Sequence, residues 1–474
     1  MIKKIMMVTA CSLSISAGVS SPAWATQTEA VSVFESSVYR DLFGTPAMRT
    51  VFSDRAMVQK WLDVEVALAK SQAELGMIPA SSAQAIAEVA KLENIDFDKL
   101  RAKTNKVGRG VNPLLGQLRK KGGKAVSEYL HFGSTTQDIM DTATVLQIKE
   151  GTALIRQELI SLMQQLADKA DQHKATVMLA RSNGQDAVPT TFGLHLSTYM
   201  MELYRHLERL DEASSRLQAQ IGSTVGTLAP YGDKGIQLQE SVADRLGLQL
   251  PIAPWNPSRD VFAEMVQTLA LIDATLGRVA IDVNNLSRTQ IDELKEGEGG
   301  ASSTMPQKRN PRASEFMGGF SRMGKMYNSA ALDMMSHSDT RQGSPWILEW
   351  SVIPESFMVT SASIERAQRL FDKLIVKPDN MKRNFDTANR FAMSEAVMNA
   401  LAAKIGRGEA YKIVKKAIKG SAPGDTLAMV IDKTPAIKQH LDQASIESLL
   451  QPENYVGSAQ HIVERSVKKV RGVN

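Results

Sequence analysis

The chain has 474 residues, of which 43% are hydrophobic, 23% charged and 5% aromatic. This length and hydrophobic content are ample for a large buried core and predict two to four domains. The formal net charge is only +5, and the basic clusters at 411–419 and 466–472 are spaced like solvated helix faces. Nucleic-acid binding is therefore not expected.

The N-terminus has the pattern of an export signal. The basic start "MIKK" is followed by the apolar run "IMMVTACSLSISAGV" and by the small residues Ala23 and Ala25. We expect cleavage after Ala25, which predicts a periplasmic or secreted protein, and the run is too short to span a bilayer. One alternative is a lipoprotein anchored through Cys11, because "VTAC" resembles a lipoprotein cleavage box. Another is an ordinary buried N-terminal helix.

Helical periodicity dominates the rest of the chain, and no strand pattern of useful length and no internal repeat is evident. The clearest pattern follows the breaker "PIAPWNPSRD", where apolar residues recur every three or four positions from Val261 to Leu286. Such a stripe can be buried only against other long helices. Similar patterns predict helices at about 136–176, 190–219 and 312–336, and a further helix after Trp350.

The predicted fold is therefore all-α, with a central bundle of long helices and two smaller helical domains. Residues 1–25 are the expected signal peptide and 26–134 the N-terminal domain. The bundle takes 135–374, and the C-terminal domain takes 375–474, after the break "IVKPDN". Bundles of this kind usually associate, so a homo-oligomer is expected.

The stretch "GGASSTMPQKRNP" at 299–311 suits neither a helix nor a strand. A glycine-rich loop between helices can close over a substrate and expel water. Ser302 and Ser303 supply hydroxyl groups, while Lys308, Asn310 and a helix starting near 312 form a plausible carboxylate site. A serine there can act as a base if nearby positive charge stabilises its alkoxide. The alternative is a plain flexible surface loop.

"SSTMPQKRNP" resembles the signature loop of the fumarase/aspartase superfamily, although Ala301 stands where that family usually has glycine. The resemblance implies an all-α fold that assembles into homotetramers with active sites built from three subunits. It also implies cofactor-free cleavage of C–N or C–O bonds beside a carboxylate of a small substrate. Ser302 would be the catalytic base, and Ser303, Lys308 and Asn310 would bind the substrate.

A second segment, "HFGSTTQDIMDTA" at 131–143, resembles the first conserved region of that family. The resemblance assigns substrate binding to His131, Thr135, Thr136 and Gln137. Hydroxyl and amide donors at the start of a long helix do favour an anion. The alternative is that Ser134 or Thr135 simply caps the helix.

A third segment, "ARSNGQDAVPTTFG" at 180–193, resembles the second conserved region, where related enzymes have Thr-His in place of Ser182-Asn183. We include Asn183 and Gln185 among the substrate-binding residues. An amide donates hydrogen bonds but does not titrate near neutral pH, so Asn183 cannot transfer a proton. This departure argues against the adenylosuccinate lyase branch.

Further segments, such as "WILEWSVIPESF" at 346–357, resemble the 3-carboxy-cis,cis-muconate cycloisomerase branch. The expected activity is therefore lyase or cycloisomerase chemistry on a di- or tricarboxylate. One alternative is a lyase that releases an amine from a substituted succinate, and another is a non-catalytic binding protein with the same fold. Arg259 and Arg341 are candidates for a second carboxylate, or equally for structural ion pairs.

The seven histidines offer no pair with metal-ligand spacing and a third ligand nearby, and no nucleotide-binding glycine fingerprint is present. We therefore predict no metal and no cofactor. His195 is expected in the core or an interface. His337 is a second candidate for a substrate-contacting histidine, behind His131. The remaining histidines are expected at the surface: His173, His206, His440 and His461.

Overall fold

The computed structural model describes residues 30–388 and 391–473. The chain divides into two compact units, Met1–Phe43 and Gly44–Asn474. The described part of the first unit contains one short 3-10 helix, η2 (Arg40–Leu42). The predicted export signal, including Cys11 and the cleavage site at Ala25, lies outside the described residues.

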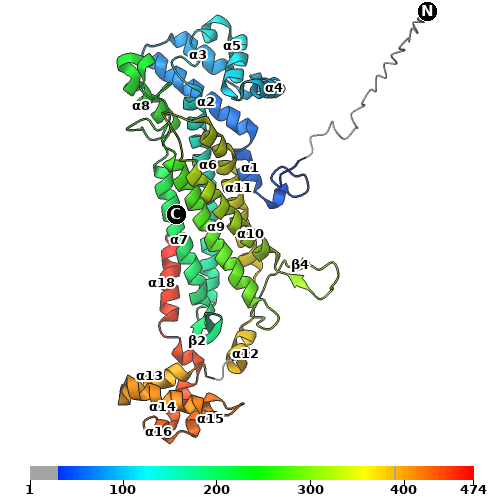
Figure 1. Cartoon of the computed structure of the whole chain (residues 1–474), viewed down its shortest axis with the longest axis vertical. Coiled ribbons are helices and arrows are strands. Elements are labelled where there is room, and N and C mark those ends of the chain that lie inside the picture. The colour runs from blue at the N-terminus through cyan, green and yellow to red at the C-terminus, as the bar shows by residue number, and fades with distance from the viewer. Residues whose placement is uncertain (1–29, 389–390, 474) are drawn as a thin grey trace, which may run out of the picture. The chain divides into compact units, whose positions relative to one another are not determined.

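Five long helices of the second unit lie side by side in a bundle (Figure 1). They confirm the predicted all-α fold, and the helix expected after Trp350 begins earlier, at Gly343. Their bounds are α6 (Thr136–Gln172), α7 (Phe192–Ser215), α9 (Asp260–Leu286), α10 (Arg312–Asp333) and α11 (Gly343–Lys373).

Helix α9 shows why the bundle forms. Its apolar stripe, including Leu269, Ile272 and Leu276, is almost completely buried. Small residues let α9 and α10 approach closely, since a Cβ added at Gly277 would lie 2.3 Å from the Ser321 hydroxyl oxygen. The apolar residues that recur every three or four positions in the sequence thus form the side of α9 that packs on its neighbours.

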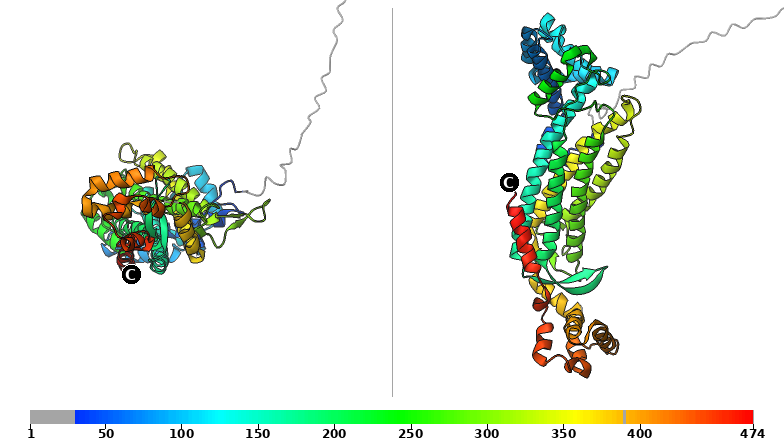
Figure 2. Two further views of the ribbon diagram at one scale, coloured as in Figure 1. Left: turned by 90° about the horizontal axis from the view of Figure 1, so that it is seen from below. Right: turned by 90° about the vertical axis from the view of Figure 1, so that its left-hand side faces the viewer.

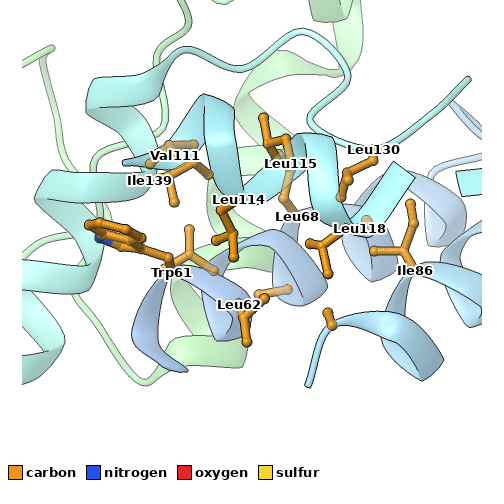
Figure 3. Close-up of a cluster of buried hydrophobic side chains, with 14 of the residues drawn as sticks. Trp61, Leu62, Leu68, Ile86, Val111, Leu114, Leu115, Leu118, Leu130 and Ile139 are labelled. Atoms are coloured by element: carbon orange, nitrogen blue, oxygen red, sulfur yellow. The ribbon is translucent and has the colours of Figure 1, made fainter. Parts of the chain in front are cut away.

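A group of shorter helices packs around the start of α6 and encloses a hydrophobic core (Figure 3). Figure 3 shows Trp61, Leu114 and Ile139 of this core converging from three helices. The core also contains Ile221 and Val242, which come from the predicted bundle domain rather than from the N-terminal one. The elements are α1 (Pro46–Val51), α2 (Asp54–Glu74), α3 (Ala80–Val89), η3 (Leu92–Asn94), α4 (Phe97–Val107), α5 (Val111–Ser127), η4 (Ala229–Lys234) and α8 (Gly235–Leu246).

The C-terminal helices enclose a second core together with Leu179 of strand β1 (Val177–Ser182). The last helix returns to the bundle and packs on α6 and α7 (Figure 2). The predicted domain boundaries at 134 and 374 both lie within one compact unit. They therefore stay predictions. The helices are α12 (Pro378–Ala388), α13 (Ser394–Ile405), α14 (Arg407–Lys419), α15 (Leu427–Asp432), α16 (Pro435–Lys438), α17 (Gln443–Leu449), η5 (Pro452–Tyr455) and α18 (Ala459–Arg471). None of the described helices combines the length and apolar character needed to cross a membrane.

The described residues also form three small antiparallel sheets: β1 (Val177–Ser182) with β2 (Gln185–Thr191), β3 (Leu294–Lys295) with β6 (Ile375–Val376), and β4 (Gly300–Ala301) with β5 (Arg309–Asn310). The expectation of no useful strand was wrong for β1 and β2. Asn183 and Gly184 both have positive φ, 53° and 73°. That is the two-residue turn that an Asn-Gly pair favours in a hairpin.

Candidate active-site segments

The first site segment is organised by a buried carboxylate in the first turn of α6. Asp138 accepts hydrogen bonds from the backbone N–H groups of Thr135 (3.0 Å), Gly222 (3.0 Å) and Ser223 (2.9 Å), and from the Ser134 hydroxyl (3.1 Å). Burial raises the pKa of Asp138 to about 6, although these bonds oppose the shift. Thr135 is the N-cap residue of α6 and forms a capping box with Asp138, so the capping alternative holds for Thr135.

His131 lies in the same turn, with a left-handed backbone (φ 67°). Its Nδ1 lies 2.6 Å from the Oε1 atom of the buried Glu65. Burial lowers the pKa of His131, but the carboxylates of Glu65 and Asp138 more than offset it, so the pKa is raised overall. Because an ionised carboxylate only accepts, Nδ1 carries a proton and Nε2 is left for another partner.

Arg259 and Gln137 are buried beneath this turn. The Arg259 guanidinium donates to both carboxylate oxygens of Glu349 (2.6 Å each) and to Asp141 (2.8 Å). Gln137 donates to Asp141 (3.0 Å) and to the Asn256 carbonyl (3.1 Å). Both side chains are about 1% exposed. Of the two alternatives for Arg259, the structure shows the ion pair, which leaves no open face for a substrate carboxylate.

Arg341 reaches the same turn from the segment between α10 and α11, which also carries His337. The exposed Arg341 donates to the Thr135 hydroxyl (3.2 Å). The backbone N–H of Gln342 donates to Nδ1 of His337 (3.2 Å), so the proton of the neutral ring sits on Nε2. Burial and the nearby Arg259 lower the pKa of His337. Arg341, unlike Arg259, remains open to a ligand.

Asn183 and Gln185 lie at the tip of the β1–β2 hairpin, beyond the opposite end of α6, and both are exposed. The hairpin is anchored by Arg181, which donates to both oxygens of the buried Glu293 (2.9 and 2.7 Å). The 37 residues of α6 rise about 1.5 Å each, so its ends are roughly 54 Å apart. Asn183 therefore cannot meet His131 within one chain.

The loop from 302 to 308 is held at its base by β4 and β5, with Gly300 paired to Asn310 (Figure 1). The Ser302 Oγ accepts hydrogen bonds from the backbone N–H groups of Met305 (3.0 Å) and Thr304 (3.3 Å). Ser303 and Lys308 are exposed, and Asn310 is half-buried. Donors that bind the hydroxyl oxygen also stabilise its deprotonated form.

The start of α10 is occupied by a side chain of the protein itself. Glu296 accepts hydrogen bonds from the backbone N–H groups of Ala313 and Ser314 (2.9 Å each) and from the Ser314 hydroxyl (2.5 Å). The expectation that these helix-start donors bind a substrate carboxylate was therefore wrong. Helix N-termini need an acceptor, and Glu296 supplies it from 17 residues upstream of Ala313, where no local spacing could reveal it.

The predicted site residues thus fall into separate groups. His131, Thr135, the half-buried Thr136 and Arg341 gather at the start of α6, with Gln137 and Arg259 below them. The hairpin tip carries Asn183 and Gln185, and the loop before α10 carries Ser302, Ser303, Lys308 and Asn310. Helix α9, which is 27 residues long and about 40 Å from end to end, leads from the first group towards the loop.

Two further histidines were expected at the surface but are buried. His173 and His206 are 9% and 5% exposed. His206 shares a hydrogen bond with Thr275 (2.8 Å), and burial lowers its pKa to about 4. Within 30–388 and 391–473, no group of three or more His, Cys, Asp or Glu side chains is arranged to hold a metal ion.

Comparison with known proteins gives the family. Residues 43–323 match the family model described as "Lyase", and residues 391–466 match "Adenylosuccinate lyase C-terminus". The chain is 35% identical to trans-aconitate decarboxylase 1 of Mycosarcoma maydis (90% of this chain, 88% of that protein). It is 33% identical to N-acetyl-S-(2-succino)cysteine lyase of Dickeya dadantii (91% and 96%).

Among solved structures, the 3-carboxy-cis,cis-muconate lactonizing enzyme of Pseudomonas putida has a TM-score of 0.84 and 32% identity, covering 91% of this chain and 98% of that one. The match to the "Lyase" model spans the segments that carry His131, Asn183 and Ser302. The signature loop, the long-helix bundle and the family models agree, and the chain belongs to the fumarase/aspartase superfamily of lyases.

Proposed function

We propose that the protein is a cofactor-free lyase or cycloisomerase in which Ser302 removes or returns a proton next to a substrate carboxylate. The observation that carries this proposal is the pair of backbone N–H groups that bind the Ser302 oxygen. A serine hydroxyl is a weak base in water, and fixed donors around its oxygen make the alkoxide more accessible.

Removal of that proton leaves negative charge on the substrate carboxylate, in an enediolate-like intermediate. The exposed ammonium group of Lys308 and the amide of Asn310 follow Ser302 on the same loop and would stabilise this charge. The hydroxyls of Thr135 and Thr136, together with Arg341, would hold a second carboxylate at the start of α6. His131, whose Nε2 is left for a partner, would contact the substrate there.

For the substrate, we propose a polycarboxylate of the carboxymuconate type, converted by cycloisomerisation. The cycloisomerase-like segments and the similarity to the lactonizing enzyme support this choice. The alternative is a lyase acting on a substituted succinate, which the similarity to N-acetyl-S-(2-succino)cysteine lyase supports. Asn183 at the hairpin tip would orient a leaving group but not protonate it.

The separation of the three segments favours sites shared between subunits, and we propose a homotetramer. One chain keeps His131 and Asn183 at opposite ends of the 37-residue α6, so a complete site requires another copy of the chain. From the N-terminal sequence we also propose export to the periplasm or the medium. Both proposals can be checked on the purified protein, by native mass spectrometry and by N-terminal sequencing.

The test is the Ser302→Ala variant, with Gln307→Ala as a matched control in the same loop. We expect Ser302→Ala to lower kcat by about 10²–10⁴-fold, since it removes the proton acceptor, while the assembly stays unchanged. Substrates are screened by the ultraviolet absorbance of carboxymuconate, fumarate and related conjugated acids. Full activity of Ser302→Ala would exclude Ser302 as the base. Carboxylate binding without turnover of any substrate would favour the non-catalytic alternative.

A further inference from the structure

We infer that a cavity beside the start of α6 binds the apolar, non-reacting part of a carboxylated substrate, with Arg109 as the partner of its remote carboxylate. This inference deepens the proposed function and rests on it. No sequence motif points to Arg109. The candidates for a second carboxylate are Arg259 and Arg341, of which Arg259 is already held by Glu349 and Asp141.

The cavity lies between α2, α4, α6 and α11 and has a volume of about 470 Å³. That is within the range of small-molecule sites, which are mostly apolar with a few convergent polar groups. Its apolar walls are formed by Met57, Trp61, Phe97, Met140, Trp350 and Ile353. Walls of this composition fit an aromatic ring or a branched hydrocarbon rather than a sugar or a phosphate.

Arg109 is the cation that this cavity offers. Its guanidinium lies 4.9 Å from the ring centres of both Trp346 and Trp350. Nη1 donates to the carbonyl of Gly108 (2.7 Å). Among the described residues, no carboxylate lies within ion-pair distance of Arg109, and burial lowers its pKa. A half-buried guanidinium with an unmatched charge, fixed by two rings, is prepared to bind an anion.

Two of the other charged groups that line the cavity already have partners. Arg101 on the rim donates to Asp98 (3.0 Å), and Glu349 on the inner wall is held by Arg259. Asp54 also lines the cavity, but it is exposed to solvent, so its charge is screened. One unmatched cation in an apolar cavity is complementary to one carboxylate on an apolar body, and two or more anionic groups would leave charge unpaired.

The position of the cavity connects it to the proposed site. Met140 and Thr144 line it from α6 and follow Thr136 by about one and two turns. Glu349 belongs both to the cavity wall and to the ion pair that lies under the Thr135 turn. A substrate bound by Thr135, Thr136 and Arg341 could therefore extend along α6 into the cavity.

The test measures binding without chemistry, using phenylacetate as the probe and its neutral analogue phenylacetamide for comparison. Three of the five tryptophans lie at the cavity or against Arg109, so their fluorescence reports occupancy. We expect saturable binding of phenylacetate to the whole enzyme, at least about tenfold tighter than binding of phenylacetamide. Equal affinities would overturn the role of the carboxylate.

Arg109→Gln should weaken phenylacetate binding about tenfold or more. Arg109→Lys should restore part of the lost affinity. Thr144→Phe should fill the cavity and abolish phenylacetate binding. Arg101→Gln is the matched control, because that guanidinium is already paired, and its effect should be much smaller. Ser302→Ala should bind the probe normally, which separates this proposal from the identity of the base. Unchanged binding in Arg109→Gln and Thr144→Phe would overturn the inference.

Discussion

The carboxyl group of Asp273 is fully buried where α9 meets α11. It accepts a hydrogen bond from the Thr360 hydroxyl (3.0 Å), and the Ser363 hydroxyl lies against it. Burial raises the pKa of Asp273 well above 3.8, although both hydroxyls oppose the shift. Since no cation pairs with it among the described residues, burial favours the protonated form of Asp273 in the folded protein.

This state makes stability fall as pH rises. The unfolded chain releases the proton of Asp273 above its ordinary pKa of 3.8, while the folded chain retains it up to the raised pKa. Between those two values folding takes up a proton, so stability declines with pH. Asp273→Asn should remove this contribution, because the amide can replace the protonated carboxyl. Urea unfolding should show the variant gaining stability over the parent as the pH rises above 3.8.

The exposed Asp244 is the control for that measurement. Asp244→Asn should leave the pH dependence of unfolding almost unchanged. A constant difference between Asp273→Asn and the parent at every pH would contradict a buried protonated carboxyl.

At the scale of elements, the position of the loop that carries Ser302 depends on Glu296. This carboxylate accepts hydrogen bonds from backbone N–H groups in the first turn of α10. Glu296→Gln replaces one carboxylate oxygen by an NH₂ group that faces donors. We expect a loss of about 1–3 kcal/mol, since buried backbone groups lose an acceptor. The loop should also open more often, and trypsin should then cleave faster after the exposed Lys308 and Arg309.

Glu298 provides a matched control two residues away. It pairs with Lys373 at an exposed position, so Glu298→Gln should change neither unfolding nor trypsin cleavage appreciably. Equal cleavage rates in Glu296→Gln and Glu298→Gln would show that the start of α10 does not govern the loop.

The long helices were predictable because each one has a helical apolar periodicity within its own sequence. The stripe of α9 repeats at the helical period, and its members are buried as that period requires. The β1–β2 hairpin was missed because its strands do not alternate clearly between apolar and polar residues. The pair Asn183-Gly184 was the available signal, since it favours the positive φ angles observed there.

The site was predictable only as separate segments. Local sequence placed Thr135 at a helix start and Ser302 in a loop, as observed. It could not show that Glu296 fills the start of α10, or that Arg259 is buried between Asp141 and Glu349. Those partners are 18, 118 and 90 residues apart in the chain, so their pairing depends on the packing of the whole bundle.

At the scale of the whole molecule, α9 is 27 residues long and spans about 40 Å between the group at the start of α6 and the loop that carries Ser302, so one site can require two copies of the chain. If His131 and Ser302 act in one site but come from different subunits, two inactive variants should complement each other. His131→Ala and Ser302→Ala, each inactive alone, are co-expressed with different tags and the hybrid is purified. Random assortment leaves about one quarter of the sites with both wild-type residues, so roughly a quarter of the parent activity should return.

The control is a hybrid of Ser302→Ala with Lys308→Ala. Both changes lie in the same loop, so no site in this hybrid receives an intact loop, and activity should stay at the level of the single variants. If each site were built within one chain, the first hybrid would be as inactive as the second. Recovery in the first hybrid alone therefore requires that the start of α6 and the 302–308 loop be contributed by different copies of the chain.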